Sequence, residues 1–207
     1  MYRKVIEWPS PKLTKKSLPL DKDTSPEVVK DLIDSFRVTG GLGLAAPQIG
    51  ISKRAIVINP THLKISEDGM LVMLNPELKL SGDLFKSHEA CFSIPYVSEI
   101  VPRYSQCTVS FYNENWEEQE LKVEGLAAAC IQHEVDHLDG ILFVRRLKSH
   151  FKRSMVFKKV KKQRIEAITG GYTHLKIKIW QYNIHLQVQQ VLHQVVHIIK
   201  FTKLFIM

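Results

Sequence analysis

The chain has 207 residues, of which 44% are hydrophobic and 24% charged, and its formal net charge is +8. This length is sufficient for one domain with a sizeable core, and the composition is ordinary for a soluble globular protein. Residues 1–9 lack the apolar stretch of a secretory signal, and no later stretch is a secure membrane span, so we expect a cytoplasmic protein.

A helix is predicted from Ser25 to about Gly40. Ser25-Pro26-Glu27 is a typical helix start, with a capping residue, a proline and an acidic first turn. Apolar residues then recur at helical spacing over residues 28–36. The run over residues 40–48 is too rich in glycine for a regular helix and too apolar for an open surface loop.

Short strands are predicted next, at residues 54–59, 70–74, 77–80, 106–113 and 120–124. Because no helix is expected between them, antiparallel pairing is favoured. Residues 125–137 form a predicted buried helix, since its first half is apolar on every side. A strand at 141–144 and an amphipathic basic helix at 146–166 complete the prediction. The expected fold class is α+β, with antiparallel strands around a central buried helix and a C-terminal basic helix.

The predicted buried helix ends in His133-Glu134-Val135-Asp136-His137, an H-E-x-x-H motif. Histidines four residues apart share one helix face and can bind one ion, while the glutamate can approach a water molecule beside it. Two ordinary histidines are the alternative, but burying this charged cluster without a cation would be costly. Asp136 points away from the metal side, so we expect it to support a ligand or to form a surface salt bridge.

A third ligand is needed. Zinc proteases add a histidine six residues after the second one, or a later glutamate. Here position 143 is Phe143, and the only later glutamate is Glu166 in the basic segment. Upstream, Cys91 offers a thiolate, which with the two histidines would leave one coordination position open to water. The other two cysteines, Cys107 and Cys130, are expected to be buried apolar residues. Three cysteines favour a reducing compartment over a disulfide framework.

Three segments together resemble the peptide deformylase family. Residues 41–48 match the family pattern G-x-G-x-A-A-x-Q, and residues 132–138 match Q-H-E-x-D-H-L. Residues 89–93 match E-G-C-[LI]-S except at Ala90 and Phe92, which replace a glycine and a smaller aliphatic residue. The resemblance extends from about residue 5 to residue 166.

The resemblance implies a ligand set and a catalytic set. Cys91, His133 and His137 would hold Fe²⁺, with Zn²⁺, Ni²⁺ or Co²⁺ as possible substitutes in the family. Glu134 would transfer the proton, and Gln48 and the backbone N–H of Phe92 would stabilise the oxyanion. Substrate binding would fall to Leu42, Gly43, Leu126, Ala129 and Cys130, with Gly43 beside the peptide backbone and the others around the methionine side chain.

The implied activity is hydrolysis of the N-formyl group from N-formylmethionyl nascent peptides, releasing formate, by a monomer whose catalytic domain spans residues 1–166. Residues 145–164 contain ten lysines and arginines and no acidic residue. The resemblance implies that they contact ribosomal RNA, whereas a solvated basic helix is the plain alternative. Residues 167–207 form a basic and apolar extension of unknown structure. An H-E-x-x-H metallopeptidase and a catalytically impaired homologue that binds ribosomes or nucleic acid remain as alternatives.

Overall fold

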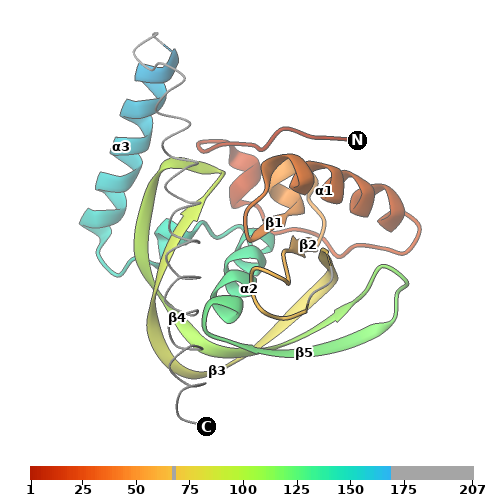
Figure 1. Cartoon of the computed structure of the whole chain (residues 1–207). Coiled ribbons are helices and arrows are strands. Elements are labelled where there is room, and N and C mark those ends of the chain that lie inside the picture. Colours follow the sequence, from red (N-terminus) through yellow and green to blue (C-terminus); the bar gives the residue numbers. More distant parts are fainter. Residues whose placement is uncertain (67–68, 169–207) are drawn as a thin grey trace, which may run out of the picture. The chain divides into compact units, whose positions relative to one another are not determined.

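The computed structural model describes residues 1–66 and 69–168 (Figure 1). The elements are η1 (Pro11–Thr14), α1 (Ser25–Thr39), β1 (Gly43–Ala45), η2 (Ala46–Ile49), β2 (Ala55–Ile58), β3 (Leu71–Cys91), β4 (Ile94–Tyr112), β5 (Glu118–Glu124), α2 (Gly125–Leu138), η3 (Phe143–Arg146) and α3 (His150–Ile168). Met1–Phe157 form one compact unit. The predicted extension lies outside the described residues, except for the last two residues of α3. None of the described helices is both long and apolar enough to cross a membrane.

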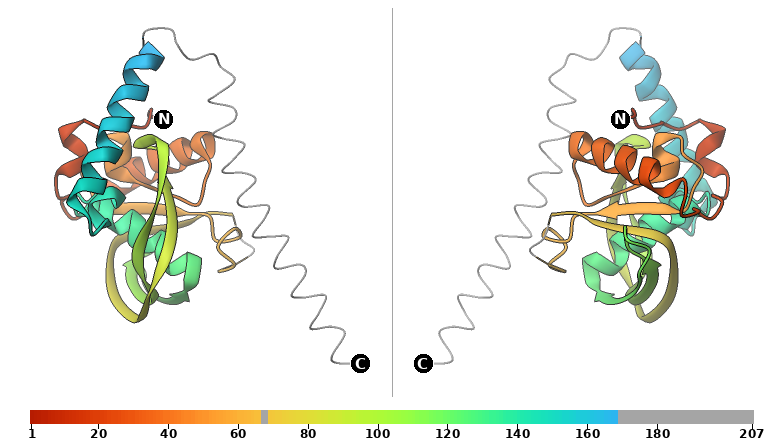
Figure 2. Two further views of the ribbon diagram at one scale, coloured as in Figure 1. Left: turned by 90° about the vertical axis from the view of Figure 1, so that its left-hand side faces the viewer. Right: turned by 90° about the vertical axis from the view of Figure 1, so that its right-hand side faces the viewer.

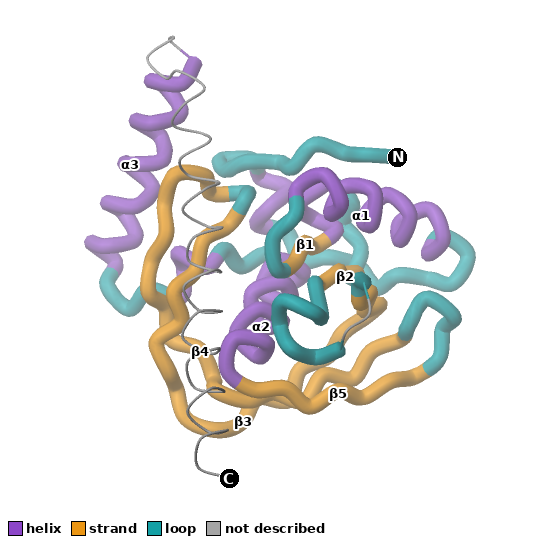
Figure 3. The backbone as a smooth tube through the Cα atoms, viewed as in Figure 1, coloured by secondary structure: helices purple, strands orange, loops and turns teal. Residues whose placement is uncertain are grey.

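The five strands form one antiparallel sheet in the order β1-β2-β3-β4-β5. The sheet curves around α2, which contacts every strand (Figure 3). The long β3–β4 hairpin twists strongly in the side views (Figure 2). The predicted fold class is therefore confirmed, with α2 as the central buried helix.

Strand β3 is much longer than the sequence predicted. The strands predicted at 70–74 and 77–80 are parts of it, separated by a register shift between Leu74 and Glu77. Asn75 has a positive φ of 50° there, and Pro76 cannot donate a backbone hydrogen bond. The Asn75 side chain exchanges two hydrogen bonds with the backbone of Leu20, which stabilises the irregularity.

Strand β2 is buried on both faces because its side chains alternate between two apolar clusters. Ala55 and Val57 pack in a cluster with the apolar face of α1. Ile56 and Ile58 pack in a second cluster with α2, strands β3 and β4, and Ala45. The sheet is thus sandwiched between α1 and α2, which fixes α2 against the strands that carry the other parts of the site.

The strand predicted at residues 141–144 is wrong. Gly140 turns the chain with a positive φ of 71°, and residues 143–146 form η3. The N–H of Ile141 bonds back to the carbonyl of Asp136, and the N–H of Arg145 bonds to Leu142, so these groups are satisfied locally. Leu142 and Phe143 are buried in the core, which explains the apolar pattern without strand pairing. The basic helix consequently starts at His150.

Candidate metal centre

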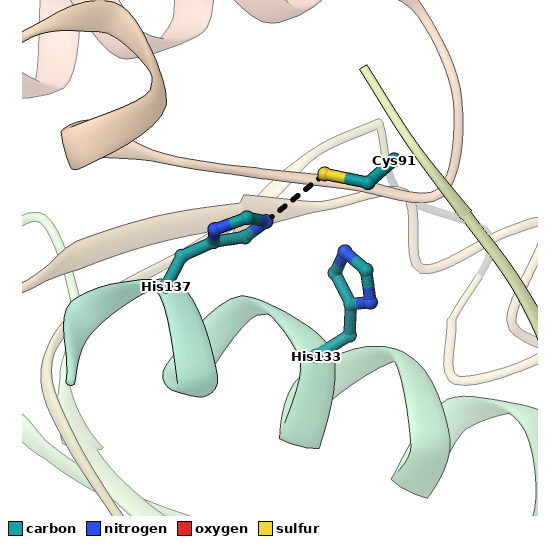
Figure 4. A group of neighbouring side chains, drawn as sticks. All are labelled: Cys91, His133 and His137. Carbon is teal, nitrogen blue, oxygen red and sulfur yellow. Dashed lines mark hydrogen bonds between the residues drawn. The ribbon is translucent and has the colours of Figure 1, made fainter. Parts of the chain in front are cut away.

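Three potential ligands converge from two elements. Cys91 is the last residue of β3, whereas His133 and His137 lie one turn apart on α2 (Figure 4). All three are buried, and their ligand atoms lie within 4.8 Å of one another. Cys91 Sγ is 3.2 Å from Nε2 of His137. A thiolate and two imidazoles in this arrangement fit a transition metal such as iron or zinc.

Phe143 occupies the position where a zinc protease would supply a third histidine. Its ring packs against His133, with ring centroids 5.9 Å apart and planes inclined by 29°. The residue therefore supports one ligand by packing and cannot itself coordinate an ion.

Glu134 is buried beside the ligands. Burial is the main reason that its pKa is raised to about 7, and a bound cation would lower it again. Its Oε2 has no hydrogen-bond partner within the described part of the chain. Because an unpartnered buried carboxylate oxygen is costly, its presence indicates that a polar group of a ligand or solvent belongs there.

Gly43 in β1 lies directly against Glu134. A Cβ atom on Gly43 would sit 2.6 Å from Oε1 of Glu134 and 2.8 Å from its Cγ. No side chain fits in this gap, so glycine is required for the strand to approach the carboxylate so closely.

Gln48 in η2 aims its amide nitrogen at the thiol ligand. Its Oε1 accepts a hydrogen bond of 2.8 Å from the N–H of Ala45. Because only the amide oxygen can accept that bond, Nε2 must face the other way. It lies 3.4 Å from Cys91 Sγ and 3.3 Å from Ser93 Oγ. The structure thus brings Gln48 and Cys91 together, as the resemblance implied.

The two departures from the family pattern are accommodated differently. Ala90 in β3 pairs with Ser98 in β4 and is not among the positive-φ residues found in the described chain, so alanine fits there. Phe92 is half-buried. Its ring lies over Gly41, where a Cβ atom would come within 3.0 Å of the ring. Phe92 therefore covers the loop that leads into β1.

A buried network of charges lies behind His133. The Nδ1 of His133 lies 2.8 Å from Oε2 of Glu89. Arg103 binds both oxygens of Glu89, at 2.7 and 2.9 Å, and reaches Asp136 at 2.6 Å. Although burial alone would raise the pKa of Glu89, hydrogen bonds from Arg103 and His133 outweigh it and lower the pKa to about 2. Asp136 also pairs with Arg146. Asp136 thus forms salt bridges, as expected: the pair with Arg103 is buried, whereas the side chain of Arg146 is 44% exposed.

A neutral contact on α2 accompanies this network. The side chain of Gln132 accepts a 3.1 Å hydrogen bond from the N–H of Tyr104 and donates a 2.8 Å bond to its carbonyl. Gln132 and Asp136 are four residues apart, so they lie on the same helix face, which is hydrogen-bonded to β4. The two metal-binding histidines follow them by one residue each and face the site instead.

The predicted substrate-binding residues of α2 share the face of the ligands. Leu126, Ala129 and Cys130 are spaced seven, four and three residues before His133, which places them on one side of the helix. Ala129 and Cys130 are buried, whereas Leu126 is 46% exposed. Leu42 packs against the same apolar cluster as Cys130. Their contact with a methionine side chain stays a prediction.

The roles of Glu89, Gln132 and Arg103 were not found from the sequence. Glu89 and Gln132 stand inside recognised motifs, but no role was assigned to either. Arg103 had a detectable signal. It follows Val101 on the inward-facing register of β4, where both residues are buried, and a charged residue there requires buried partners.

The comparisons with known proteins agree with this geometry. A family model described as Polypeptide deformylase matches residues 2–153. The peptide deformylase of Desulforudis audaxviator is 40% identical over 153 residues, covering 72% of this chain and 96% of that relative.

Solved structures give the same result. The crystal structure of a peptide deformylase from Legionella pneumophila is 34% identical with a TM-score of 0.72, covering 81% of this chain and 98% of that one. A class I type b peptide deformylase from Acinetobacter baumannii, solved with Met-Ala-Ser bound, is 30% identical with a TM-score of 0.65, covering 71% of this chain and 99% of that one. The chain therefore belongs to the peptide deformylase family of metal-dependent hydrolases.

Proposed function

We propose that this deformylase acts on nascent peptides that begin with N-formylmethionine and releases formate from them. The observation that carries this proposal is the convergence of Cys91, His133 and His137 beside the buried carboxylate of Glu134. The relative from A. baumannii was solved with Met-Ala-Ser, the peptide that would remain after formyl-Met-Ala-Ser loses its formyl group.

The metal would be held by Cys91 Sγ and one ring nitrogen each from His133 and His137. When bound, it would supply positive charge that polarises the formyl carbonyl and acidifies a water molecule. We propose Fe²⁺ as the native ion, with Zn²⁺, Ni²⁺ or Co²⁺ as substitutes, because the family resemblance favours iron and the donor set accepts all four.

Glu134 carries the proton in this proposal. Its free Oε2 takes a proton from the attacking water, and the oxygen of that water bonds to the formyl carbon. As the C–N bond breaks, the same carboxyl group passes the proton to the departing nitrogen. The second hydrogen of the water leaves the product formic acid and protonates the new amino group, so formate and an ammonium group result and atoms and charge balance.

Two hydrogen-bond donors stabilise the negative charge on the formyl oxygen. One is Nε2 of Gln48, which the N–H of Ala45 orients toward the site. The other is the backbone N–H of Phe92, the residue that follows the thiol ligand. The methionine side chain would then contact Leu42, Leu126, Ala129 and Cys130, while the peptide backbone passes Gly43 as an added strand.

The test is release of formate from formyl-Met-Ala-Ser by anaerobically prepared protein loaded with Fe²⁺. We expect turnover by the wild type and a loss of about 10²- to 10⁴-fold in Glu134→Gln, because that variant lacks the proton carrier but keeps all three ligands. Cleavage of an internal bond in an unformylated peptide would instead indicate a metallopeptidase. Absence of stoichiometric metal in the wild type would indicate an impaired homologue.

The setting of the enzyme is part of the same proposal. We infer a cytoplasmic monomer with a catalytic domain at residues 1–166, which contacts ribosomal RNA through residues 145–164. The three cysteines are free and buried, which suits a reducing compartment. The cationic residues at 145, 146, 148, 152, 158, 159, 161 and 162 are exposed, as phosphate contacts require.

A further inference from the structure

The metal ligands belong to two elements that must be held at a fixed separation. Cys91 ends β3, and both histidines lie on α2. An ion can bind all three only if the strand and the helix keep their relative position to within a few tenths of an ångström. Apolar packing alone is a weak way to fix such a position, because it is not directional.

Arg103 connects these two elements. Its Nε and Nη2 bind the carboxylate of Glu89, which lies two residues before Cys91 on β3. Its Nη1 binds Asp136, which precedes His137 on α2. The side chain is 3% exposed, so water does not compete for its donors. A planar guanidinium can hold both carboxylates at once in a fixed direction, whereas a lysine ammonium cannot.

Through Glu89, the network around Arg103 reaches the ligand His133, but it does not reach the ring of His137. Glu89 also accepts a hydrogen bond from Nδ1 of His133, so the strand, the arginine and the ligand share one carboxylate. In contrast, Nδ1 of His137 has no partner among the described residues. The orientation of His133 thus depends on Glu89, and the orientation of Glu89 depends on Arg103.

We propose that Arg103 is a positioning residue of the metal centre. By joining Glu89 to Asp136, it keeps the thiol-bearing end of β3 in register with the histidine-bearing face of α2. This inference rests on the proposed ligand set. Breaking a buried ion pair also destabilises the fold, so the positioning role is tested by metal affinity and by the spectrum of the bound metal, which a purely structural role would leave unchanged.

The test compares metal binding by the wild type, Arg103→Lys and Asp136→Asn. Zn²⁺ affinity is measured by competition with a chromogenic chelator, and Co²⁺-loaded protein gives the absorption band that reports thiolate-to-cobalt charge transfer. We expect both variants to bind Zn²⁺ about 10- to 100-fold more weakly, with a weaker charge-transfer band, because Cys91 no longer meets the ion in the correct position.

Arg54→Gln is the matched control. Arg54 forms a 2.7 Å ion pair with Asp139, just beyond the end of α2, but does not contact Glu89 or Asp136. Its loss should change Zn²⁺ affinity by no more than about twofold. Should Arg103→Lys fail to fold, Asp136→Asn is compared with Arg146→Gln, because Asp136 pairs with both arginines and only Asp136→Asn weakens the contact with Arg103.

Two results separate failure of this inference from failure of the proposed function. If the wild type binds stoichiometric metal, and both variants keep its affinity and cobalt spectrum while losing only unfolding free energy, Arg103 is merely structural. If the wild type itself binds no stoichiometric Zn²⁺ or Co²⁺, the ligand set and the proposed function are wrong, and the role of Arg103 falls with them.

Discussion

Gly43 and Glu134 are in direct contact, and this contact limits how the site can vary. The carboxylate of Glu134 fills the space where any other residue at position 43 would place its Cβ atom. Both residues are buried, so neither can move into solvent to relieve a clash. The glycine of the first motif therefore leaves room for Glu134 of the third motif, the proposed proton carrier, in addition to its predicted contact with the peptide backbone.

We expect Gly43→Ala to lower kcat for a formyl peptide by about 10- to 100-fold, because Glu134 must leave its present rotamer to admit the methyl group. Metal content should stay at the wild-type level, since the atoms nearest to the added methyl group all belong to Glu134. Steady-state kinetics and metal analysis on the same preparation check both statements. Gly69→Ala is the control, because a Cβ atom there meets nothing within 4 Å. Equal kcat for the two variants would contradict this account of Gly43.

Helix α1 contributes to the site indirectly, through the sheet. Its buried residues Val28, Leu32 and Phe36 pack on the face of β2 that lies opposite α2. Each large side chain removed from water contributes roughly 1.5–3 kcal/mol, so this face is a main source of stability for the strands beneath the metal centre.

Truncating one of these residues gives a measurable test. Leu32 is 0% exposed, and we expect Leu32→Ala to lower the free energy of unfolding by about 2–5 kcal/mol. Leu18 is 66% exposed, so Leu18→Ala should change it by no more than about 0.5 kcal/mol. Urea denaturation followed by circular dichroism measures both values. A similar loss in the two variants would show that α1 is not part of the core as described.

The elements differ in how well the sequence predicted them. Helices α1 and α2 were placed almost to the residue, because apolar periodicity is a local property. The predicted cap at Ser25 was wrong: Thr24 is the N-cap of α1, and its side chain makes no capping hydrogen bond. The extent of β3 was missed, since its outer half is mostly exposed and depends on pairing with β4. The segment 141–144 was misread because a short buried apolar run resembles a strand whether or not it has a partner.

The residues of the site also differ in how well the sequence predicted them. The ligands and Glu134 could be predicted because metal chemistry demands particular residue types at helical spacing. Gln48 and Cys91 were found through recognised motifs, and the structure shows that they lie side by side. The partners of Arg103 could not be predicted, because they come from cross-strand register and from a helix more than 20 residues away in the sequence. Such long-range pairings leave almost no local trace.

At the scale of the whole chain, charge is distributed unevenly between the two ends. The net charge of +8 arises from a mildly acidic body and a strongly basic C-terminal part. Within α3, Lys152 pairs with Glu99 and Lys162 lies 4.0 Å from Glu166, but most of the basic residues face solvent. An exposed cationic surface of this kind favours polyanions and makes binding sensitive to salt.

Replacing Lys158, Lys159 and Lys162 with glutamine should therefore weaken association with ribosomes. Each lost phosphate contact should reduce the slope of log affinity against log salt by about 0.7–0.9, which gives a total reduction of about 2–3. Co-sedimentation at several salt concentrations measures this slope. The matched control replaces Lys12, Lys15 and Lys16, which are equally exposed but lie near the N-terminus. If both triple variants lose the same affinity, binding depends on net charge alone and not on α3.

On α2, Gln132 and Asp136 face β4, whereas His133 and His137 face the metal centre. This arrangement has a consequence for protein engineering. Copying the H-E-x-x-H spacing onto a foreign helix reproduces the separation of the two imidazoles but leaves the rotation of the helix undetermined. In this chain, Gln132 and Asp136 set that rotation through their hydrogen bonds with Tyr104 and Arg103 on β4. The smallest unit that could carry the metal centre into another protein is therefore a helix together with two strands. One strand bears the thiol, and the other bears an inward-facing arginine.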